Sequence, residues 1–225
     1  MSKSTTITLE IGNLRFHCKG DAKWTAKQFD RLLDHLARNG PEETTVRAAP
    51  AAPEIVVITA DVAEYGCDVL VLKYAQGFHG ADHAVARRLA QPTAETGFDR
   101  DGFSLQPWTH QAVSSRGTVS ARSVLFVGVP SLGSFGYDQI QEFAAHALRA
   151  VVESTAPVDS IAMTIHGVGY GLQEQEAFQA QLAGIRIAFG TPDVKNRIRR
   201  VAIVERDPER AHRLREQLRR DNGLG

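Results

Sequence analysis

The sequence predicts an α/β fold in which a mixed, mostly parallel sheet lies between two helical layers, a three-layer αβα arrangement. From residue 54 onward, short apolar runs alternate with longer stretches whose apolar residues recur at helical spacing. The runs are rich in β-branched residues, and glycine-containing turns follow three of them. Hydrophobic residues make up 43% of the 225-residue chain and charged residues 23%, which is enough apolar material for a substantial core.

The first 53 residues predict a separate small unit. TITLEI and LRFHCK each alternate apolar and polar residues around Gly12-Asn13, which predicts a hairpin, and WTAKQFDRLLDHLARN has helical periodicity. We therefore expect a ββα appendage at residues 1–40 and a Pro- and Ala-rich linker at 41–53, before the α/β domain at 54–225. Because a hairpin with one helix is marginal alone, we expect the appendage to dock on the rest of the chain, on a protein partner or on a second copy.

The elements of the larger domain follow from local pattern. IVVIT and DVLVLKY are too short for helices, while ADHAVARRLA places Ala81, Val85 and Leu89 on one side of a helix. Asp207 and Pro208 mark the start of the last helix as N-cap and first residue. We expect strands at 55–59, 68–74, 120–130, 159–167 and 199–207, and helices at 81–91, 137–155, 174–190 and 208–221. The long segment 92–117 is expected to hold a short strand pair or a functional lid.

Three glycine loops, at 76–80, 130–137 and 166–172, each follow an expected strand. Ligands of α/β proteins bind beyond the carboxyl ends of the strands, so the three loops are expected to line one rim. A glycine loop that leads into a helix can present backbone N–H groups to an anion. The alternative is an ordinary tight turn between a strand and a helix.

Two stretches carry a family resemblance. TADVAEYGCDVLVLKYAQGFHGADHAVARRL resembles the opening of a macro domain, with Asp61-Val62 at the family's Asp-Ile, 73–76 at its Asn-rich turn and 77–81 at its glycine run. HGVGYG, residues 166–171, resembles the later loop that wraps the diphosphate of ADP-ribose in that family. The stretches VLFVGVPSLGSFGYDQIQEFAAHAL and LQEQEAFQAQLAGI are similar to the macro-like N-terminal domain of leucyl aminopeptidases. The resemblance covers roughly residues 54–220.

The resemblance implies a macro-like fold and a nucleotide-type ligand related to ADP-ribose. The Asn-rich turn, whose asparagine supports hydrolysis in catalytic members, reads Lys-Tyr-Ala-Gln here. Phe78 and His79 also stand where the family has small residues that let the backbone approach a ribose. These departures disfavour a hydrolase. The residues that we expect to contact ligand are Asp61, Lys73, Gln76, Gly77, His79, Gly80, Asp82, His166, Gly167, Gly169, Tyr170 and Gly171.

Several of these side chains also have structural interpretations. Asp61 could accept hydrogen bonds from an adenine amino group or only cap a turn. Lys73, at the end of an apolar strand, could contact a phosphate or carboxylate or be an exposed edge residue. His79 with Asp82 and His83 could form an acid–base set, although an aspartate in the first turn of a helix is favoured by the helix dipole alone.

The later loop has the same ambiguity. His166 could contact ligand or pack beneath its loop, and Tyr170 could stack on a base or sugar or simply plug the loop.

Composition limits the other possibilities. The formal net charge is zero, so neither nucleic acid nor a membrane surface is expected as a partner. Cys18 and Cys67 lie far apart without metal-ligand spacing, and neither a disulfide, a metal nor a cofactor is expected. No signal-like or membrane-spanning run is present in the sequence, which favours a cytoplasmic location.

Three functions remain open at this stage. The first is a recognition or assembly module without chemistry of its own, which binds an ADP-ribose-like nucleotide; the resemblance suggests a place in a bacterial stress or defence system. The second is an ADP-ribosyl-type hydrolase that uses Asp82 or His79 with water. The third is a structural module that forms oligomers through its appendage.

Overall fold

The computed structural model describes residues 4–11, 14–21, 53–154 and 158–223. The chain divides into two units, Met1–Pro50 and Ala51–Gly225. In the first unit, β1 (Ser4–Ile11) pairs antiparallel with β2 (Leu14–Asp21), so the expected hairpin is present, with Ile11 opposite Leu14. The helix expected near 24–39 and nearly all of the linker lie outside the described residues.

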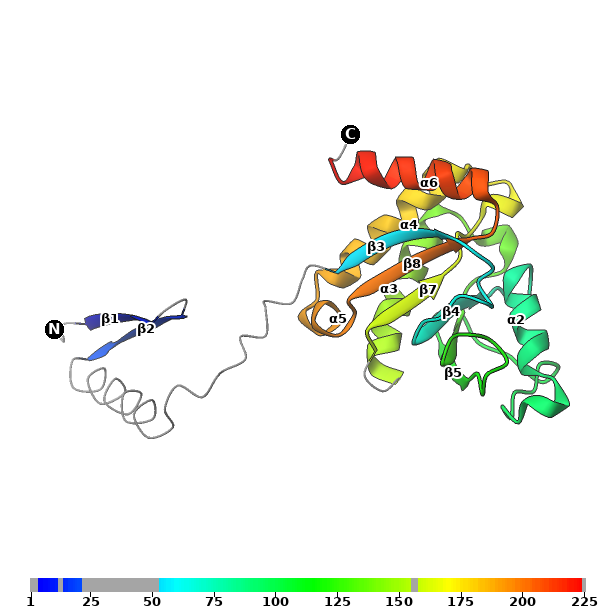
Figure 1. Cartoon of the computed structure of the whole chain (residues 1–225), viewed down its shortest axis with the longest axis horizontal. Coiled ribbons are helices and arrows are strands. Elements are labelled where there is room, and N and C mark those ends of the chain that lie inside the picture. The colour runs from blue at the N-terminus through cyan, green and yellow to red at the C-terminus, as the bar shows by residue number, and fades with distance from the viewer. Residues whose placement is uncertain (1–3, 12–13, 22–52, 155–157, 224–225) are drawn as a thin grey trace. The chain divides into compact units, whose positions relative to one another are not determined.

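The second unit is built on a six-stranded sheet (Figure 1). Its strands are β3 (Glu54–Thr59), β4 (Val69–Tyr74), β5 (His110–Ser114), β6 (Ser123–Gly128), β7 (Ser160–Met163) and β8 (Arg200–Glu205). Their order across the sheet is β3-β8-β7-β4-β6-β5, and every neighbouring pair is parallel except β5 with β6. The predicted α/β class with a mixed, mostly parallel sheet is confirmed.

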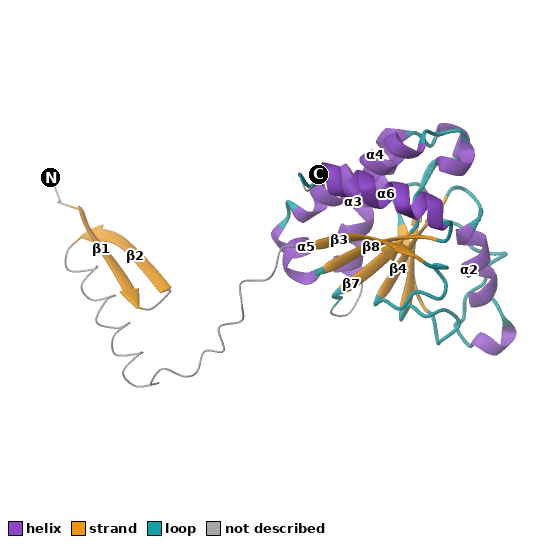
Figure 2. Ribbon diagram, turned by 45° about the horizontal axis from the view of Figure 1, so that its top comes forward, coloured by secondary structure: helices purple, strands orange, loops and turns teal. Residues whose placement is uncertain are grey.

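Helices cover both faces of this sheet (Figure 2). One face packs against α3 (Tyr137–Ser154), α4 (Glu174–Phe189), α5 (Pro192–Arg197) and α6 (Pro208–Asp221). The other packs against α2 (Ala81–Leu89) and the segment between α2 and β6. β4 is buried at all six positions, as expected for a central strand with helices on both sides.

The segment 92–117 differs from expectation. It contributes one strand, β5, which pairs with β6 rather than with a second strand of the segment. Phe98 and Phe103 pack against Phe126 with ring centroids 5.4 and 5.3 Å from it, so the segment completes the core on the α2 side. Apolar residues in an aperiodic stretch gave no sign of this role, because the packing depends on partners distant in sequence.

Two packing details have consequences for stability. Gly184 of α4 lies so close to α3 that a Cβ atom there would stand 2.1 Å from the carbonyl oxygen of Gln141. At the β3 edge of the sheet, Arg215 of α6 donates Nε–H to the carbonyl of Val57 (3.0 Å) and also bonds the hydroxyl of Thr59. These bonds occupy groups on an edge strand that would otherwise be open to another strand.

Among the described residues, no helix combines the length and apolar character that a membrane span requires.

Candidate functional site

A pocket of about 510 Å³ lies at the carboxyl ends of the parallel strands. Its walls come from residues 60–63 after β3, the end of β4 with the first turn of α2, residues 164–170 after β7, and residues 204–206 at the end of β8. This is the place where open α/β sheets bind ligands. A second hollow of about 360 Å³ lies between residues 96–104 and β5, and none of the expected ligand residues lines it.

Most of the residues singled out from the sequence meet in the larger pocket. Those that line it are Asp61, Lys73, His79, Gly80, Asp82, His166, Gly167, Gly169 and Tyr170. Gln76, Gly77 and Gly171 do not line it, and neither does any residue of the loop 130–137, so two of the three glycine loops form the rim. Sequence reasoning missed Arg88, Glu205, Arg206 and Arg210. Glu205 is the last residue of β8 and Arg206 follows it. The expectation that ligands bind beyond the carboxyl ends of the strands could therefore have identified both residues.

The floor of the pocket consists of three buried polar residues, Lys73, Asp82 and His166. They are 5%, 1% and 2% exposed. Lys73 Nζ forms an ion pair with Asp82 Oδ2, which joins the end of β4 to the first turn of α2. Lys73 is therefore not the exposed edge residue that we considered as its alternative.

Burial sets the protonation of this floor. It raises the pKa of Asp82 to about 6, although the nearby Lys73 ammonium opposes the rise. Burial also holds the pKa of His166 well below its usual value, and the charge of Lys73 lowers it further, so this imidazole is neutral at pH 7. Nε2 of His166 has no hydrogen-bond partner within the described part of the chain. At neutral pH the floor therefore contains one cation, one anion and one neutral imidazole with an unused polar atom.

Two aromatic side chains that line the pocket, His79 and Tyr170, lie next to each other. The rings of His79 and Tyr170 stand edge to face with centroids 6.3 Å apart, and Lys73 Nζ lies 6.0 Å from the centre of the Tyr170 ring. Tyr170 is 48% exposed, so a large part of its surface is free to contact a ligand. Burial and the charges of Lys73 and His83 lower the pKa of His79, which favours its neutral form.

Glycine is required by the backbone at two of the lining positions. Gly80, the N-cap of α2, has φ +57° and ψ −123°, a combination that side-chain-bearing residues rarely adopt. Gly167 has φ +87°, and a Cβ there would stand 2.5 Å from Cδ1 of Leu172. Gly169 differs, because a Cβ there would meet no atom within 4 Å. A side chain at Gly169 therefore has room to form without disturbing the fold.

The turn at 73–76 has a structural role. The Gln76 amide donates hydrogen bonds to the carbonyls of Val129 (2.9 Å) and Leu105 (3.3 Å). Nε2 of Gln76 therefore bonds backbone carbonyls next to the pocket, and Gln76 itself does not line the pocket. Phe78 does not crowd the pocket either, since its ring packs against Tyr74 and Phe126 with centroids 5.0 and 5.4 Å apart.

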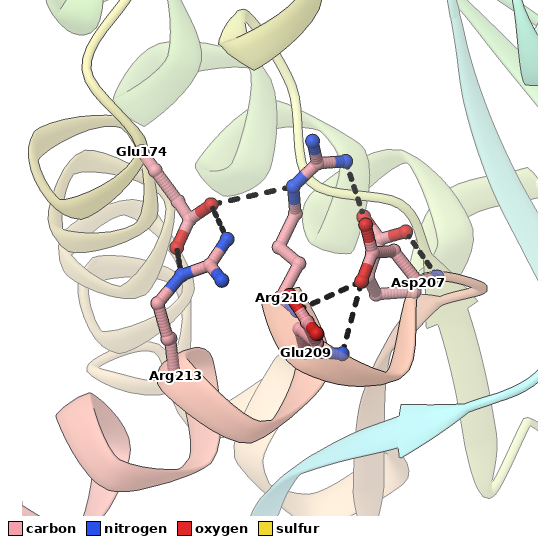
Figure 3. A network of polar contacts seen from close by, with 6 residues as sticks. Glu174, Asp207, Glu209, Arg210 and Arg213 are labelled. Carbon is pink, nitrogen blue, oxygen red and sulfur yellow. Dashed lines mark hydrogen bonds and ion pairs between the residues drawn. The ribbon is translucent and has the colours of Figure 1, made fainter.

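Arg210 and Glu205 line the pocket and belong to a network of arginine and acidic side chains that extends beyond it (Figure 3). Arg210 contacts Glu205 at 3.2 Å and Glu174 at 3.3 Å, and Arg213 holds the same Glu174 carboxylate at 2.7 and 2.8 Å. Asp207 caps α6 by accepting from the backbone N–H groups of residues 209 and 210. After the neighbouring strand β3, Asp61 Oδ1 accepts from the Ala63 N–H at 2.9 Å, so this aspartate caps a turn while it lines the pocket.

No protein-family model matches the sequence, and no curated protein sequence matches it. Solved structures do match the fold. The Trypanosoma brucei macrodomain superimposes with a TM-score of 0.58 and 16% identity, over 73% of this chain and 66% of that chain. A mutant of the Oceanobacillus iheyensis macrodomain also gives a TM-score of 0.58 and 16% identity, over 77% of this chain and 95% of that chain.

The fold is that of a macrodomain. A further structure with the macrodomain fold, the T. brucei protein in complex with ADP-ribose, gives a TM-score of 0.54 at 17% identity over 73% of this chain and 68% of that chain. The present chain therefore spans about two thirds of the T. brucei protein and nearly all of the O. iheyensis one. The macrodomain fold predicted from the sequence is confirmed, whereas the resemblance to leucyl aminopeptidases stays a prediction.

Proposed function

We propose that residues 51–225 bind a nucleotide-type ligand, ADP-ribose or a close relative, in the pocket at the carboxyl ends of the strands. The observation that carries the proposal is the convergence of nine residues, chosen from the sequence, on one pocket of suitable size. Structures of the same fold in complex with ADP and with ADP-ribose support this ligand class. Arg88, Arg206 and Arg210 at the mouth suit phosphate groups, and the exposed Tyr170 ring suits a base or a sugar.

The proposal predicts stabilisation by ADP-ribose. At a hundred times its dissociation constant, a ligand that binds only the native state adds about 2.7 kcal/mol to the free energy of unfolding, which raises the midpoint of thermal unfolding. Gly169→Glu is expected to abolish the shift while the protein stays folded, because the new carboxylate occupies open space at the pocket and repels phosphates. The measurement is a thermal-shift titration, with isothermal titration calorimetry for the affinity.

The matched control is Gly133→Glu. Gly133 lies in the loop 130–137, does not line the pocket, and also has no atom within 4 Å of a Cβ, so its variant should keep the shift. A wild-type protein that ADP-ribose, ADP and NAD all fail to stabilise would refute nucleotide binding. If the wild type hydrolyses an ADP-ribosylated substrate and Asp82→Asn does not, the protein is a hydrolase and not a binding module without chemistry of its own.

We further propose that residues 1–40 recruit a protein partner or a second copy of the chain. A two-stranded hairpin such as β1–β2 leaves both of its outer edges available for pairing and is marginal in isolation. Deletion of residues 1–45 should lower the mass of the native particle by more than the mass of the deleted segment, as measured by light scattering. A particle whose mass falls only by that of the segment, together with an unchanged set of co-purifying proteins, would count against this role.

A further inference from the structure

Lys73 has an unusual place among the cations of this protein. It is the one lysine or arginine of residues 53–154 and 158–223 that is more than nine-tenths buried, while Arg88, Arg206 and Arg210 line the same pocket with larger exposure. Residues 54–225 contain two lysines, Lys73 and Lys195, and all their other permanently charged basic side chains are arginines. The floor thus has a compact point charge, whereas the mouth has guanidinium groups that suit bidentate contacts to phosphate.

The positive charge at the floor is already neutralised. Asp82 stands in the first turn of α2, so its carboxylate compensates both the Lys73 ammonium and the positive end of the helix. His79 and His166, the imidazoles near Lys73, both have lowered pKa values and add no charge at neutral pH. The floor is therefore polar but has no net charge.

We propose that the Lys73–Asp82 pair makes the floor of the pocket accept an uncharged, hydroxyl-bearing group and reject an anionic one. The inference deepens the proposed function, because it states which end of a nucleotide-type ligand reaches the floor. At the mouth, Arg88 pairs with Glu64 and Arg210 pairs with Glu205 and Glu174, but both arginines stay partly exposed. Among the described residues Arg206 has no ion pair, so it remains available to an anion. Such a mouth and a neutral floor together fit a ligand whose phosphates stay at the mouth and whose inner end carries hydroxyls.

The physical reason is the asymmetry between a hydroxyl and an anion. A hydroxyl can accept from Lys73 or donate to Asp82 or to Nε2 of His166, and it leaves the ion pair intact. An anion that approaches Lys73 must either lie beside the buried Asp82 carboxylate or displace it. Both are costly in a site with little water, since a buried charge without its partner is strongly unfavourable.

Removal of the Asp82 charge should therefore create an anion site. Asp82→Asn leaves the Lys73 ammonium without its counter-ion, and sulfate is expected to bind roughly tenfold or more tightly to this variant than to the wild type at about pH 7.5. The measurement is isothermal titration calorimetry of the full chain with sulfate at constant ionic strength. Lys73→Met/Asp82→Asn should lose the gain. Asp138→Asn, which changes an exposed aspartate in the first turn of α3 outside the pocket, should bind sulfate as the wild type does.

Acid provides a second route to the same state without mutation. Protonation of Asp82, whose pKa burial raises to about 6, leaves Lys73 unpaired while sulfate keeps both of its charges. Lys73 on β4 is the charged group that acts most directly on Asp82. Other titratable or charged groups around it are His79 and His83 at the start of α2, His166 after β7, and the pocket-lining Asp61, Arg88, Glu205, Arg206 and Arg210. Wild-type sulfate binding should strengthen several-fold between about pH 7.5 and about pH 5, and should do so in His79→Gln as well. In Asp82→Asn the pH dependence should nearly vanish.

The outcomes separate this inference from the proposed function. Equal sulfate affinity in the wild type and Asp82→Asn, with no strengthening in acid, would overturn the charge rule even if ADP-ribose binds. If ADP-ribose binds, Asp82→Asn should shift the preference from ADP-ribose toward ADP, which ends in a phosphate, and an unchanged ratio would also overturn the rule. If no nucleotide binds the wild type, the proposed function fails, and the sulfate experiments still decide the property of the floor.

Discussion

Lys73→Met is expected to destabilise the protein by about 3–5 kcal/mol at pH 7.5, because it leaves the Asp82 carboxylate buried without a counter-ion. A buried carboxyl group whose pKa is raised in the folded state stabilises the fold at low pH and loses this contribution as the pH rises through that pKa. In the wild type this pKa is about 6, and without Lys73 it should be higher still. The deficit of the variant should therefore be largest above pH 7 and shrink toward pH 4. Urea unfolding at several pH values measures it.

The double variant Lys73→Met/Asp82→Asn is the control for this prediction. It removes both charges, so it should recover most of the lost stability and remove the pH dependence that Lys73→Met introduces. If Lys73→Met lowers the free energy of unfolding by less than about 1 kcal/mol, the Lys73–Asp82 pair is not desolvated, since exposed ion pairs contribute no more than that.

Gly184→Ala is expected to lower the free energy of unfolding by about 2–3 kcal/mol. Its Cβ would stand 2.1 Å from the carbonyl oxygen of Gln141 and 2.9 Å from Cβ of Ala144, so α3 and α4 must move apart. The gain in helix propensity from glycine to alanine, about 1 kcal/mol, is too small to offset this. The midpoint of denaturant unfolding, with an unchanged slope, is the measurement.

Gly169→Ala is the matched control for Gly184→Ala. A Cβ at Gly169 meets no atom within 4 Å, so this variant should lie within about 0.5 kcal/mol of the wild type. Equal effects of the two substitutions on the free energy of unfolding would show that α3 and α4 can move apart without loss of stability.

The fold class and nine of the residues that line the pocket could be predicted because both follow from patterns that are local in sequence. Alternation of apolar runs with helical periodicity gives the strands and helices, and the carboxyl ends of parallel strands must meet at one edge of the sheet. His79 and Gly80 precede a helix, and His166 and Tyr170 follow a strand, so position along the chain already assigned them to the rim.

Other features depend on contacts between distant segments, and local patterns gave no sign of them. The pairing of Lys73 with Asp82 was not predicted, since an ion pair between a strand end and a helix start depends on how the intervening loop turns. The interactions of Gln76 with Val129 and Leu105, and those of Arg210 with Glu174, likewise join segments that only the tertiary fold brings together. The role of 92–117 in the core was missed for the same reason.

The position of β3 affects how the protein can be synthesised. β3 is the first strand of its sheet along the chain, yet it pairs only with β8, the last strand, and Arg215 of α6 bonds the carbonyl of Val57 and the hydroxyl of Thr59 on it. During translation β3 leaves the ribosome well before β8 and α6 are synthesised. This apolar strand therefore stays unpaired until nearly all of the unit has emerged. Folding of this unit should therefore be completed late in translation or after release, and a nascent chain that stalls before β8 should be a substrate for chaperones that bind exposed apolar segments.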